Sequence, residues 1–357
     1  MCGRAHKSVR SSWRRLAICL SCLVAFLLCP SLRALADDLV VEQLPSMTYT
    51  HFSGGVIAEN GLLYVWGGAP GYTTPLEIYD PAGNVWSSGA DLPAGRAGMG
   101  EFALNGLIYS LGGEGASAGH FTNTLYRYNP AGNAWTTLNG FPRNTWDTEV
   151  SVVGNTAYAF GGRTGYGPTY ADVYAYNAST DSWTSKADML FSVMGEGHTV
   201  YDGKIWVFGG THGYSESNRV NTKMVQIYDP AANTWTQGAD MPSLLSLVQA
   251  VTFGDSIWVF GGNRHDDTLG WIDNHTAYEF LPASGEWKEH GLSVPSRDLE
   301  PYSSVEVIDG YAYFVNLYSG DISTTEAYRA QLPEPATLSL LALGGLALLR
   351  RRRTASS

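Results

Sequence analysis

The stretch that decides the fold reads Ile205-Trp206-Val207-Phe208-Gly209-Gly210, and it is followed by Tyr228-Asp229-Pro230 and then by Trp235. An aromatic, apolar strand thus ends at two glycines, and a turn triplet and a tryptophan come after it. Glycine permits left-handed backbone conformations, and an Asp-Pro step favours a tight turn. The stretch therefore predicts short antiparallel strands connected by sharp turns.

The same pattern occurs five times, with successive glycine pairs 45, 49, 48 and 52 residues apart. The pairs are Gly67-Gly68, Gly112-Gly113, Gly161-Gly162, Gly209-Gly210 and Gly261-Gly262. The turn triplets begin at Tyr79, Tyr128, Tyr176, Tyr228 and Phe280, and the tryptophans are Trp86, Trp135, Trp183, Trp235 and Trp287. Such a repeat indicates units that bury their faces only by packing against one another.

This register of Gly-Gly, Tyr-Asp-Pro and Trp resembles the kelch repeat. The resemblance implies a β-propeller in which each repeat is a four-stranded antiparallel sheet, or blade, with its tryptophan packed between neighbouring blades. A sixth, degenerate copy lies at residues 305–315, where Asn316-Leu317 replaces the glycine pair. Residues 38–45 are similar to an outer strand of the first repeat and are expected to close the ring. We therefore predict an all-β, six-bladed propeller over residues 37–332.

The composition agrees with this fold. The 357 residues include 41 glycines, 11 tryptophans and 21 tyrosines, and only 15% are charged, as expected of many short strands and tight turns. The cysteines are Cys2, Cys19, Cys22 and Cys29. The predicted propeller therefore has no thiol for a disulfide, a cysteine-zinc site or a cysteine nucleophile.

The N-terminus has the features of a secretory signal peptide over residues 1–36. Five basic residues precede an apolar run at 16–28, and Ala34 and Ala36 occupy the two small-residue positions of a cleavage site. The run is short for a membrane span, which disfavours an uncleaved anchor. A lipoprotein signal through Cys19 or Cys22 lacks the small residues that should precede it.

Three features follow one another in the C-terminal tail, residues 333–357: Pro333-Glu334-Pro335, an uncharged run at 336–349, and Arg350, Arg351, Arg352 and Arg353. They resemble the PEP-CTERM sorting signal of Gram-negative bacteria, which implies cleavage by an exosortase in organisms that usually make exopolysaccharide. As a helix the run covers about 21 Å of a roughly 30 Å hydrocarbon core, with its arginines in the cytoplasm. We expect transient insertion of a precursor in the inner membrane, then release to the cell envelope or outside the cell; the alternative is a plain C-terminal anchor.

The net charge excludes one class of partner. The formal charge is −11, and loss of the signal peptide, which has six basic residues and no acid, brings it to −17. A domain this acidic repels nucleic acid, so DNA or RNA binding is not expected.

Candidate ligand-binding residues lie where the chain enters the inner strands, because these segments converge on the propeller axis. They are Arg96, Arg143, Glu149, Glu196, His198, Arg297, Asp298 and Glu300. Arginine forks bind carboxylates and acids bind hydroxyls, so this mixture predicts recognition of a polyhydroxylated or acidic sugar. Taken alone, a charged residue of this kind is more often a solvent-exposed loop residue than a ligand-binding one. We rank Arg96, Arg143, Glu149, Glu196 and Arg297 first.

The loops after the glycine pairs carry a second polar set. It comprises Arg163, Tyr166, His212, Tyr214, Arg219, Arg264, His265, Asp266, Asp267, Trp271, Asp273 and His275. Its histidines and aspartates are suitable ligands for a divalent metal, but their spacing matches no metal signature. We predict neither a metal nor a cofactor.

Three classes of secreted propeller enzyme come into consideration, and the sequence argues against two of them. Galactose-oxidase-like enzymes need a tyrosine–cysteine cofactor, and the predicted propeller has no cysteine. Sialidases carry Ser-x-Asp-x-Gly-x-Thr-Trp turns that do not occur here. Six-bladed sialic-acid mutarotases use carboxylate and arginine groups at the channel mouth, which Glu149, Glu196 and Arg297 resemble.

The sequence favours a non-catalytic binding or structural protein of the cell envelope or extracellular matrix. Its propeller face would bind a glycan, such as exopolysaccharide, or a protein, and signal peptidase and exosortase would process it. The alternative is a sugar mutarotase or epimerase-like enzyme outside the cytoplasm. A third possibility is a protein-interaction scaffold, since propellers have many unrelated functions.

Overall fold

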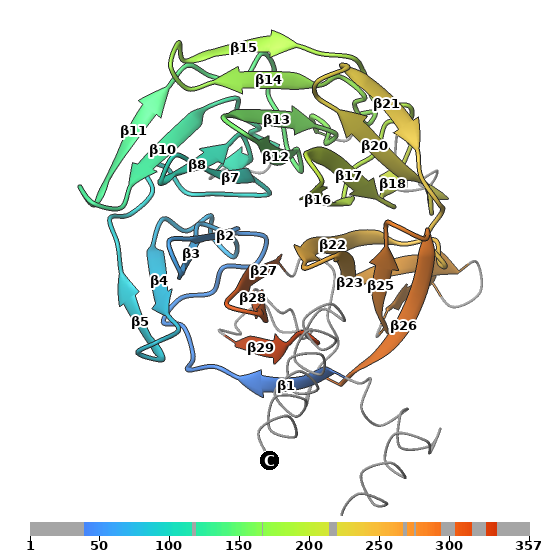
Figure 1. Cartoon of the computed structure of the whole chain (residues 1–357). Helices are drawn as coiled ribbons and strands as arrows, with labels where there is room; N and C mark the ends of the chain where they lie inside the picture. Colours follow the sequence, from blue (N-terminus) through green and yellow to red (C-terminus); the bar gives the residue numbers. More distant parts are fainter. Residues whose placement is uncertain are drawn as a thin grey trace, which may run out of the picture.

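The computed structural model describes residues 39–115, 119–165, 167–213, 220–266, 270–274, 276–293, 304–315 and 326–333. The regular secondary structure in these ranges is β, and its sheets surround a central axis (Figure 1). No helix in the described part of the chain is long and apolar enough to cross a membrane. Several predicted positions lie outside the described residues: Ala34, Ala36, Arg297, Glu300, Glu334, Pro335, Arg350, Arg351, Arg352 and Arg353.

Four repeats form separate four-stranded antiparallel sheets. The first contains β2 (Gly55–Glu59), β3 (Leu62–Trp66), β4 (Leu76–Asp80) and β5 (Val85–Ser88). The second contains β7 (Gly100–Leu104), β8 (Leu107–Leu111), β10 (Leu125–Asn129) and β11 (Ala134–Leu138). The third contains β12 (Glu149–Val153), β13 (Thr156–Phe160), β14 (Tyr174–Asn177) and β15 (Ser182–Ser185). The fourth contains β16 (Gly197–Tyr201), β17 (Lys204–Phe208), β20 (Val225–Asp229) and β21 (Thr234–Gln237).

The remaining strands form one nine-stranded sheet with the order β22-β23-β25-β26-β1-β29-β28-β27, and β24 pairs with β23. The fifth repeat supplies β22 (Ser246–Phe253), β23 (Ser256–Asp266), β24 (Gly270–Asp273), β25 (Thr276–Leu281) and β26 (Glu286–Ser293). The sixth supplies β27 (Ser304–Ile308), β28 (Tyr311–Val315) and β29 (Ala327–Gln331), and β1 is Leu39–Gln43. Two short pairs, β6 (Arg96–Ala97) with β9 (Glu114–Gly115) and β18 (Thr211–His212) with β19 (Val220–Asn221), lie outside the main sheets.

Strand β1 corrects the prediction of six separate blades. It pairs antiparallel with β29, with Val41 opposite Ala330, as expected of a strand that completes the degenerate repeat. It also pairs parallel with β26, with Leu39 opposite Leu292. The fifth and sixth repeats are therefore one continuous sheet, and the structure has four separate sheets and one joined sheet.

The glycine pairs are required by the backbone. All ten glycines have positive φ, and at Gly67 and Gly68 the values are 68° and 96°. A Cβ atom on Gly68 would lie 2.6 Å from the carbonyl carbon of His51. Side chains at such positions are strained and here also lack space, which confirms the close turn predicted from these pairs.

The turn triplets contain a tyrosine whose hydroxyl donates to an Asn or Asp five residues later. The four bonds are Tyr79–Asn84 at 2.6 Å, Tyr128–Asn133 at 2.8 Å, Tyr176–Asp181 at 2.8 Å and Tyr228–Asn233 at 2.7 Å. Each acceptor residue has a positive φ of 45–52°, a conformation that Asn and Asp tolerate. In the fifth repeat Phe280 has no hydroxyl, and Gly285, with φ of 73°, takes the left-handed position.

The repeat tryptophans connect adjacent blades, as predicted. The Trp135 ring lies 5.1 Å from that of Tyr128 in its own sheet and 6.0 Å from that of Trp66 in the preceding sheet. Its indole N–H also donates to the carbonyl of Ala90 at 2.8 Å. Apolar clusters of this kind lie between neighbouring sheets around the ring.

Candidate functional site

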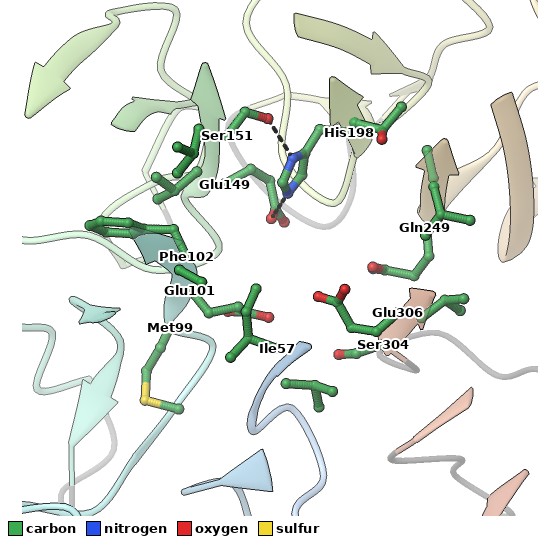
Figure 2. Close-up of a pocket in the computed structure, with 18 of the residues that line it drawn as sticks. Ile57, Met99, Glu101, Phe102, Glu149, Ser151, His198, Gln249, Ser304 and Glu306 are labelled. Atoms are coloured by element: carbon green, nitrogen blue, oxygen red, sulfur yellow. Dashed lines mark hydrogen bonds and ion pairs between the residues drawn. The ribbon is translucent and has the colours of Figure 1, made fainter. Parts of the chain in front are cut away.

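The first strand of each repeat faces a cavity on the propeller axis. These strands are β2, β7, β12, β16, β22 and β27, and the cavity has a volume of about 440 Å³. Small-molecule sites typically measure roughly 300–1,000 Å³. Figure 2 shows the polar side chains of Glu101, Glu149, His198, Gln249 and Glu306 around this space.

The strand register gives each wall residue a counterpart in the other repeats. Glu149 pairs with Phe160 and Gln249 with Phe260, the residues just before their glycine pairs. The first, second and fourth repeats have glycine at this place, at positions 55, 100 and 197. Equivalent positions of the wall are therefore polar in some repeats and glycine in others.

Glu149, His198 and Ser151 form a hydrogen-bonded chain in the wall. Glu149 and Ser151 lie two residues apart on β12, and His198 stands on the neighbouring strand β16. His198 Nε2 lies 3.0 Å from Glu149 Oε2, and its Nδ1 lies 2.8 Å from Ser151 Oγ. With the Glu149 carboxylate as acceptor, Nε2 carries the proton and Nδ1 accepts from the serine hydroxyl.

Exposure separates the roles in this chain. The Glu149 and His198 side chains are 22% and 24% exposed, whereas Ser151 is 4% exposed. The carboxylate and the imidazole are therefore the more accessible groups of the wall, and the buried hydroxyl of Ser151 holds the imidazole through Nδ1.

Glu101 and Glu306 flank β2 from its two neighbouring blades. Glu101 accepts a hydrogen bond from the Val56 backbone N–H and Glu306 from that of Ala58. Burial, and then repulsion by Glu149, Glu306 and Asp147, holds the pKa of Glu101 well above its usual range. Burial raises the pKa of Glu306 to about 8. Burial thus favours the neutral acid at both positions, and a neutral carboxyl group can donate a hydrogen bond into the cavity.

Glu196 lies behind the wall rather than in it. It is 1% exposed, and its carboxyl oxygens accept no hydrogen bond from any other described residue. A Cβ atom on Gly161 would clash with its Oε1. Burial, followed by repulsion from Glu149 and Asp147, raises its pKa well above the usual value. Its counterparts in other repeats are uncharged: Gly54, Met99, Thr148 and Val248.

One end of the cavity is bordered by five left-handed residues, each two positions before the place that Glu149 and Gln249 occupy in the first five repeats. They are Ser53, Gly98, Asp147, Gly195 and Leu247, with φ of 54–62°. Backbone bonds join them across blades: Gly98 N–H to Ser53 O at 2.8 Å, Asp147 N–H to Gly98 O at 3.0 Å and Leu247 N–H to Gly195 O at 2.5 Å. These bonds fix where the inner strands begin and hence where the wall side chains point.

The structure corrects the predicted position of two arginines. Arg96 is 4% exposed, stacks 4.5 Å over the Tyr126 ring and donates to the Gly112 carbonyl at 3.1 Å. Arg143 binds both carboxylate oxygens of Asp172 and stacks 3.8 Å over a tyrosine ring. Neither lines the cavity. The guanidinium groups of both arginines bind aromatic faces, carbonyls and a carboxylate between the blades. The two side chains therefore do not extend to the axis.

The other predicted residues divide between the cavity and its surroundings. Glu149 and His198 line the cavity, and Glu196 is buried behind it. Arg163 stacks 4.6 Å over Trp146, and the ring of His212 lies 4.5 Å from that of Phe191. In the described ranges, no group of three or more His, Cys, Asp or Glu is arranged to hold a metal ion. Tyr166, Tyr214, Arg219, Asp267, His275 and Asp298 lie outside these ranges, as do the side chains of His265, Asp266, Trp271 and Asp273.

Sequence reasoning missed four polar wall residues: Glu101, Ser151, Gln249 and Glu306. The predicted residues come from the segments that enter the inner strands, whereas these four lie along the strands themselves. The glycine pairs could have identified them. Each pair ends the second strand of a repeat, so counting back through the hairpin shows which residue of the first strand lies opposite each residue of the second.

Comparison with known proteins identifies the family. The chain belongs to the Attractin/LZTR1 beta-propeller family, whose profile matches residues 63–315. The PEP-CTERM protein-sorting motif matches residues 331–353, which confirms the predicted sorting motif. This motif supports export to the cell envelope or the extracellular space.

Kelch proteins are among the relatives, in agreement with the predicted repeat. Kelch-like protein 36 of Mus musculus is 28% identical over 188 residues, 50% of this chain and 30% of that protein. Kelch-like protein 25 of Rattus norvegicus is 31% identical over 124 residues, 33% of this chain and 21% of that protein. Beta-scruin of Limulus polyphemus is 28% identical over 144 residues, 40% of this chain and 16% of that protein. The chain thus spans less than a third of the length of these relatives.

The fold is also that of a solved structure. The structure of YjhT superposes with a TM-score of 0.68 over 81% of this chain and 95% of that one, at 17% sequence identity. This similarity shows a shared propeller fold.

Proposed function

We propose that the protein is an exported binding protein whose propeller recognises a glycan in the axial cavity. One observation carries the proposal: carboxyl, imidazole and amide groups from five blades surround a cavity of about 440 Å³. The Glu149 carboxylate accepts hydrogen bonds, and the neutral acid of Glu306 and the amide of Gln249 also donate them. A polyhydroxylated ring needs both kinds of partner on several sides.

The processing of the chain belongs to the same proposal. Signal peptidase cleaves after Ala36, and an exosortase acts near Pro333 on a precursor held in the inner membrane by its tail. The product is a propeller over residues 37–332 with six blades, two of them joined through β1. It resides in the envelope or the extracellular matrix of a Gram-negative, exopolysaccharide-producing bacterium.

Calorimetry and thermal shift on residues 37–332 test the glycan proposal. A ligand at a hundred times its dissociation constant adds about 2.7 kcal/mol to the free energy of unfolding. The shift should disappear in Glu149→Gln, which removes the acceptor in the cavity. It should persist in Glu289→Gln, which alters an exposed carboxylate on the outer strand β26. Retained affinity in Glu149→Gln would place the ligand elsewhere, and no shift with any neutral, amino or acidic sugar would remove the proposal.

A second candidate function, a sugar mutarotase or epimerase-like enzyme, is favoured by one specific observation. The cavity holds the carboxylate of Glu149, which His198 and Ser151 fix in place through hydrogen bonds, together with a neutral acid, Glu306. Such a pair can act as general base and general acid on one substrate.

The reaction would interconvert the anomers of a reducing sugar. Glu149 takes the proton of the anomeric hydroxyl, Glu306 protonates the ring oxygen, and the bond between that oxygen and the anomeric carbon breaks to give the open-chain carbonyl compound. Reclosure on the other face returns both protons. Exchange NMR measures the interconversion: the protein should accelerate it, and Glu149→Gln and Glu306→Gln should return it to the background rate. Wild-type protein that leaves the rate at background would exclude this candidate.

A further inference from the structure

We infer that the membrane-held precursor stands with one defined end of the propeller toward the lipid, so that the polar part of the axial cavity points away from the membrane. The inference rests on the proposed membrane-held precursor and goes beyond it, because it assigns the membrane-facing surface. That surface is the hairpin end, formed by the turns between the first and second strands of the six repeats. The turns are Asn60-Gly61, Asn105-Gly106, Gly154-Asn155, Asp202-Gly203, Gly254-Asp255 and Asp309-Gly310.

The six turns lie together at one end of the propeller axis. Backbone bonds join the residues that precede the first strands of neighbouring blades, as between the N–H of Asp147 and the carbonyl of Gly98 at 3.0 Å. First strands that begin side by side run in the same direction along the axis, so their turns share the opposite end. There a Cβ atom on Gly106 would lie 4.0 Å from the side-chain nitrogen of Asn60, in the turn of the neighbouring blade.

Both ends of the folded chain leave the propeller at the hairpin end. Strand β29 is followed by Leu332, which is 2% exposed and donates its N–H to the carbonyl of Gly310 at 2.9 Å. Strand β1 runs antiparallel to β29, with Val41 opposite Ala330 (Figure 1). This register places Leu39, the first residue of β1, beside Leu332, and both belong to one apolar cluster. The predicted signal peptide and the tail therefore start from the same place on the propeller.

The tail leaves the propeller little slack. Its uncharged run begins at residue 336, so only Pro333, Glu334 and Pro335 separate that run from the buried Leu332. Four residue steps span at most about 14 Å, even when fully extended. The eight-residue strand β22, which runs along the axis, is about 26 Å long. A propeller tethered this closely cannot turn over on its exit point, so the hairpin end stays next to the lipid and the other end is held away from it.

The polar part of the cavity lies toward the end that is held away. The carboxyl, imidazole and amide groups of the wall occupy the first three places of the strand register, counted from that of Glu149. The fourth place, nearer the hairpin end, has small side chains in every repeat. They are Ala58, Ala103, Val152, Val200, Thr252 and Val307. The Thr252 hydroxyl donates to the Val200 carbonyl at 2.9 Å. A polar ligand is therefore bound from the end away from the membrane, and the precursor can bind it before its tail is removed.

The hairpin turns do not themselves attract anionic lipid, which binds basic segments. Asp202, Asp255 and Asp309 are exposed acids in three of the turns, and the other three turns carry neutral side chains. Lys204 follows one of these acids and is paired with Asp229 at 3.3 Å. The tail therefore holds this end at the membrane, and cleavage of the tail frees the propeller from the lipid.

Fluorescence quenching on the precursor after loss of the signal peptide, residues 37–357, tests the inference. These residues include no cysteine, so a single probe can be attached at either end of β22. Asp255→Cys lies in the hairpin turn that follows β22, and Leu244→Cys replaces a 51% exposed side chain that precedes it. The vesicles contain phosphatidylethanolamine and phosphatidylglycerol with nitroxide-labelled headgroups. The Asp255→Cys probe should lose most of its fluorescence, whereas the Leu244→Cys probe, about 26 Å farther from the lipid, should retain it.

Two matched proteins serve as controls. Residues 37–332 with the same probes lack the tail and should show no quenching at either position. Insertion of about twenty Gly and Ser residues after Pro333 gives a flexible tether with a mean span of about 25 Å. The propeller can then turn over, and the difference between the two probes should disappear.

The outcomes separate the orientation from the anchoring. Equal quenching of the two probes in the anchored precursor, or stronger quenching of the Leu244→Cys probe, would overturn the inference and leave the membrane-held precursor intact. A precursor that does not co-sediment with the vesicles would overturn the membrane-held precursor itself and the inference with it.

Discussion

Replacement of Glu77 by alanine should destabilise the propeller by about 3–5 kcal/mol. The Glu77 carboxylate is buried in the first blade, where it accepts the backbone N–H groups of Thr48 and Tyr49 at 2.8 and 3.0 Å. It also lies 3.1 Å from Nε2 of His51, whose side chain is fully buried. His51 Nδ1 faces the Gly67 carbonyl at 2.8 Å. Because both ring nitrogens face acceptors, both donate, and the imidazole carries a positive charge.

The magnitude follows from what alanine would leave behind. Two backbone N–H groups and a cationic imidazole would lose their acceptor inside the protein. Three charge-assisted bonds at about 1.5–3 kcal/mol each set an upper limit, and water entering the gap recovers part of it. The cost of removing one partner of a buried ion pair, about 3–5 kcal/mol, is therefore the better guide.

The fourth blade provides a matched control. Gln226 is the register counterpart of Glu77, and its neutral amide binds the N–H and the carbonyl of Phe191 at 2.9 and 3.0 Å. Gln226→Ala should cost about 1–3 kcal/mol. With a urea slope of about 3 kcal/mol per molar, the midpoint should fall by about 1–1.7 M in Glu77→Ala and by about 0.3–1 M in Gln226→Ala. An equal or smaller fall in Glu77→Ala would refute the reasoning.

The pH dependence provides a second check on Glu77. Burial acts to raise its pKa, but hydrogen bonds from His51, Thr48 and Tyr49 hold the value below the usual 4.5. The contribution of Glu77 to the free energy of unfolding is therefore present above about pH 4.5. It is lost as the pH falls through the lower pKa of the folded state. Glu77→Gln should remove that acid-dependent loss.

Three further results are expected. Glu306→Gln should flatten the fall in unfolding free energy between about pH 4.5 and 8, because burial raises the pKa of Glu306 to about 8 and the folded state then holds a proton that the unfolded state releases. Gly161→Ala should destabilise the protein by more than about 1 kcal/mol, because φ is +67° and Cβ would meet Glu196; Glu196→Ala should restore part of the loss. Tyr228→Phe should cost about 1 kcal/mol, because Asn233 loses the hydroxyl donor.

Each of these results has a control and a contradicting outcome. An unchanged pH slope in Glu306→Gln would contradict a buried neutral acid. Gly61→Ala also places alanine at positive φ, here 75°, but with no atom within 4 Å, so an equal loss there would show that Glu196 has no part. Tyr49→Phe, at a half-exposed side chain outside the turns, is the control for Tyr228→Phe; equal losses would dismiss the turn bond.

The fold was predictable because its signals are local. Gly209-Gly210, Tyr228 and Trp235 each serve a backbone or packing need that recurs in every blade, so the repeat can be found without any contact information. The parallel pairing of β1 with β26 was not predictable, because it depends on where two distant strands end. No residue type signals that Leu39 meets Leu292.

The site was predictable only in part, for a related reason. Glu149 and His198 were found because they lie at the start of inner strands. Arg96 and Arg143 were placed wrongly because sequence position does not specify the direction of a long side chain, and Tyr126 and Asp172 provide closer partners. Glu306 was missed because its repeat has no glycine pair from which to count.

The pairing of β1 with β29 also bears on the order in which the chain is made. Glu42 and Arg329 bond to each other although 287 positions separate them. Strand β1 is therefore synthesised long before its partner β29. Until the two strands pair, the ring is open and has two free sheet edges. Closing so long a loop is slow and entropically costly, and free edges can pair with other chains. A chain that stops before β29 would therefore be prone to aggregate, although most of its blades are complete.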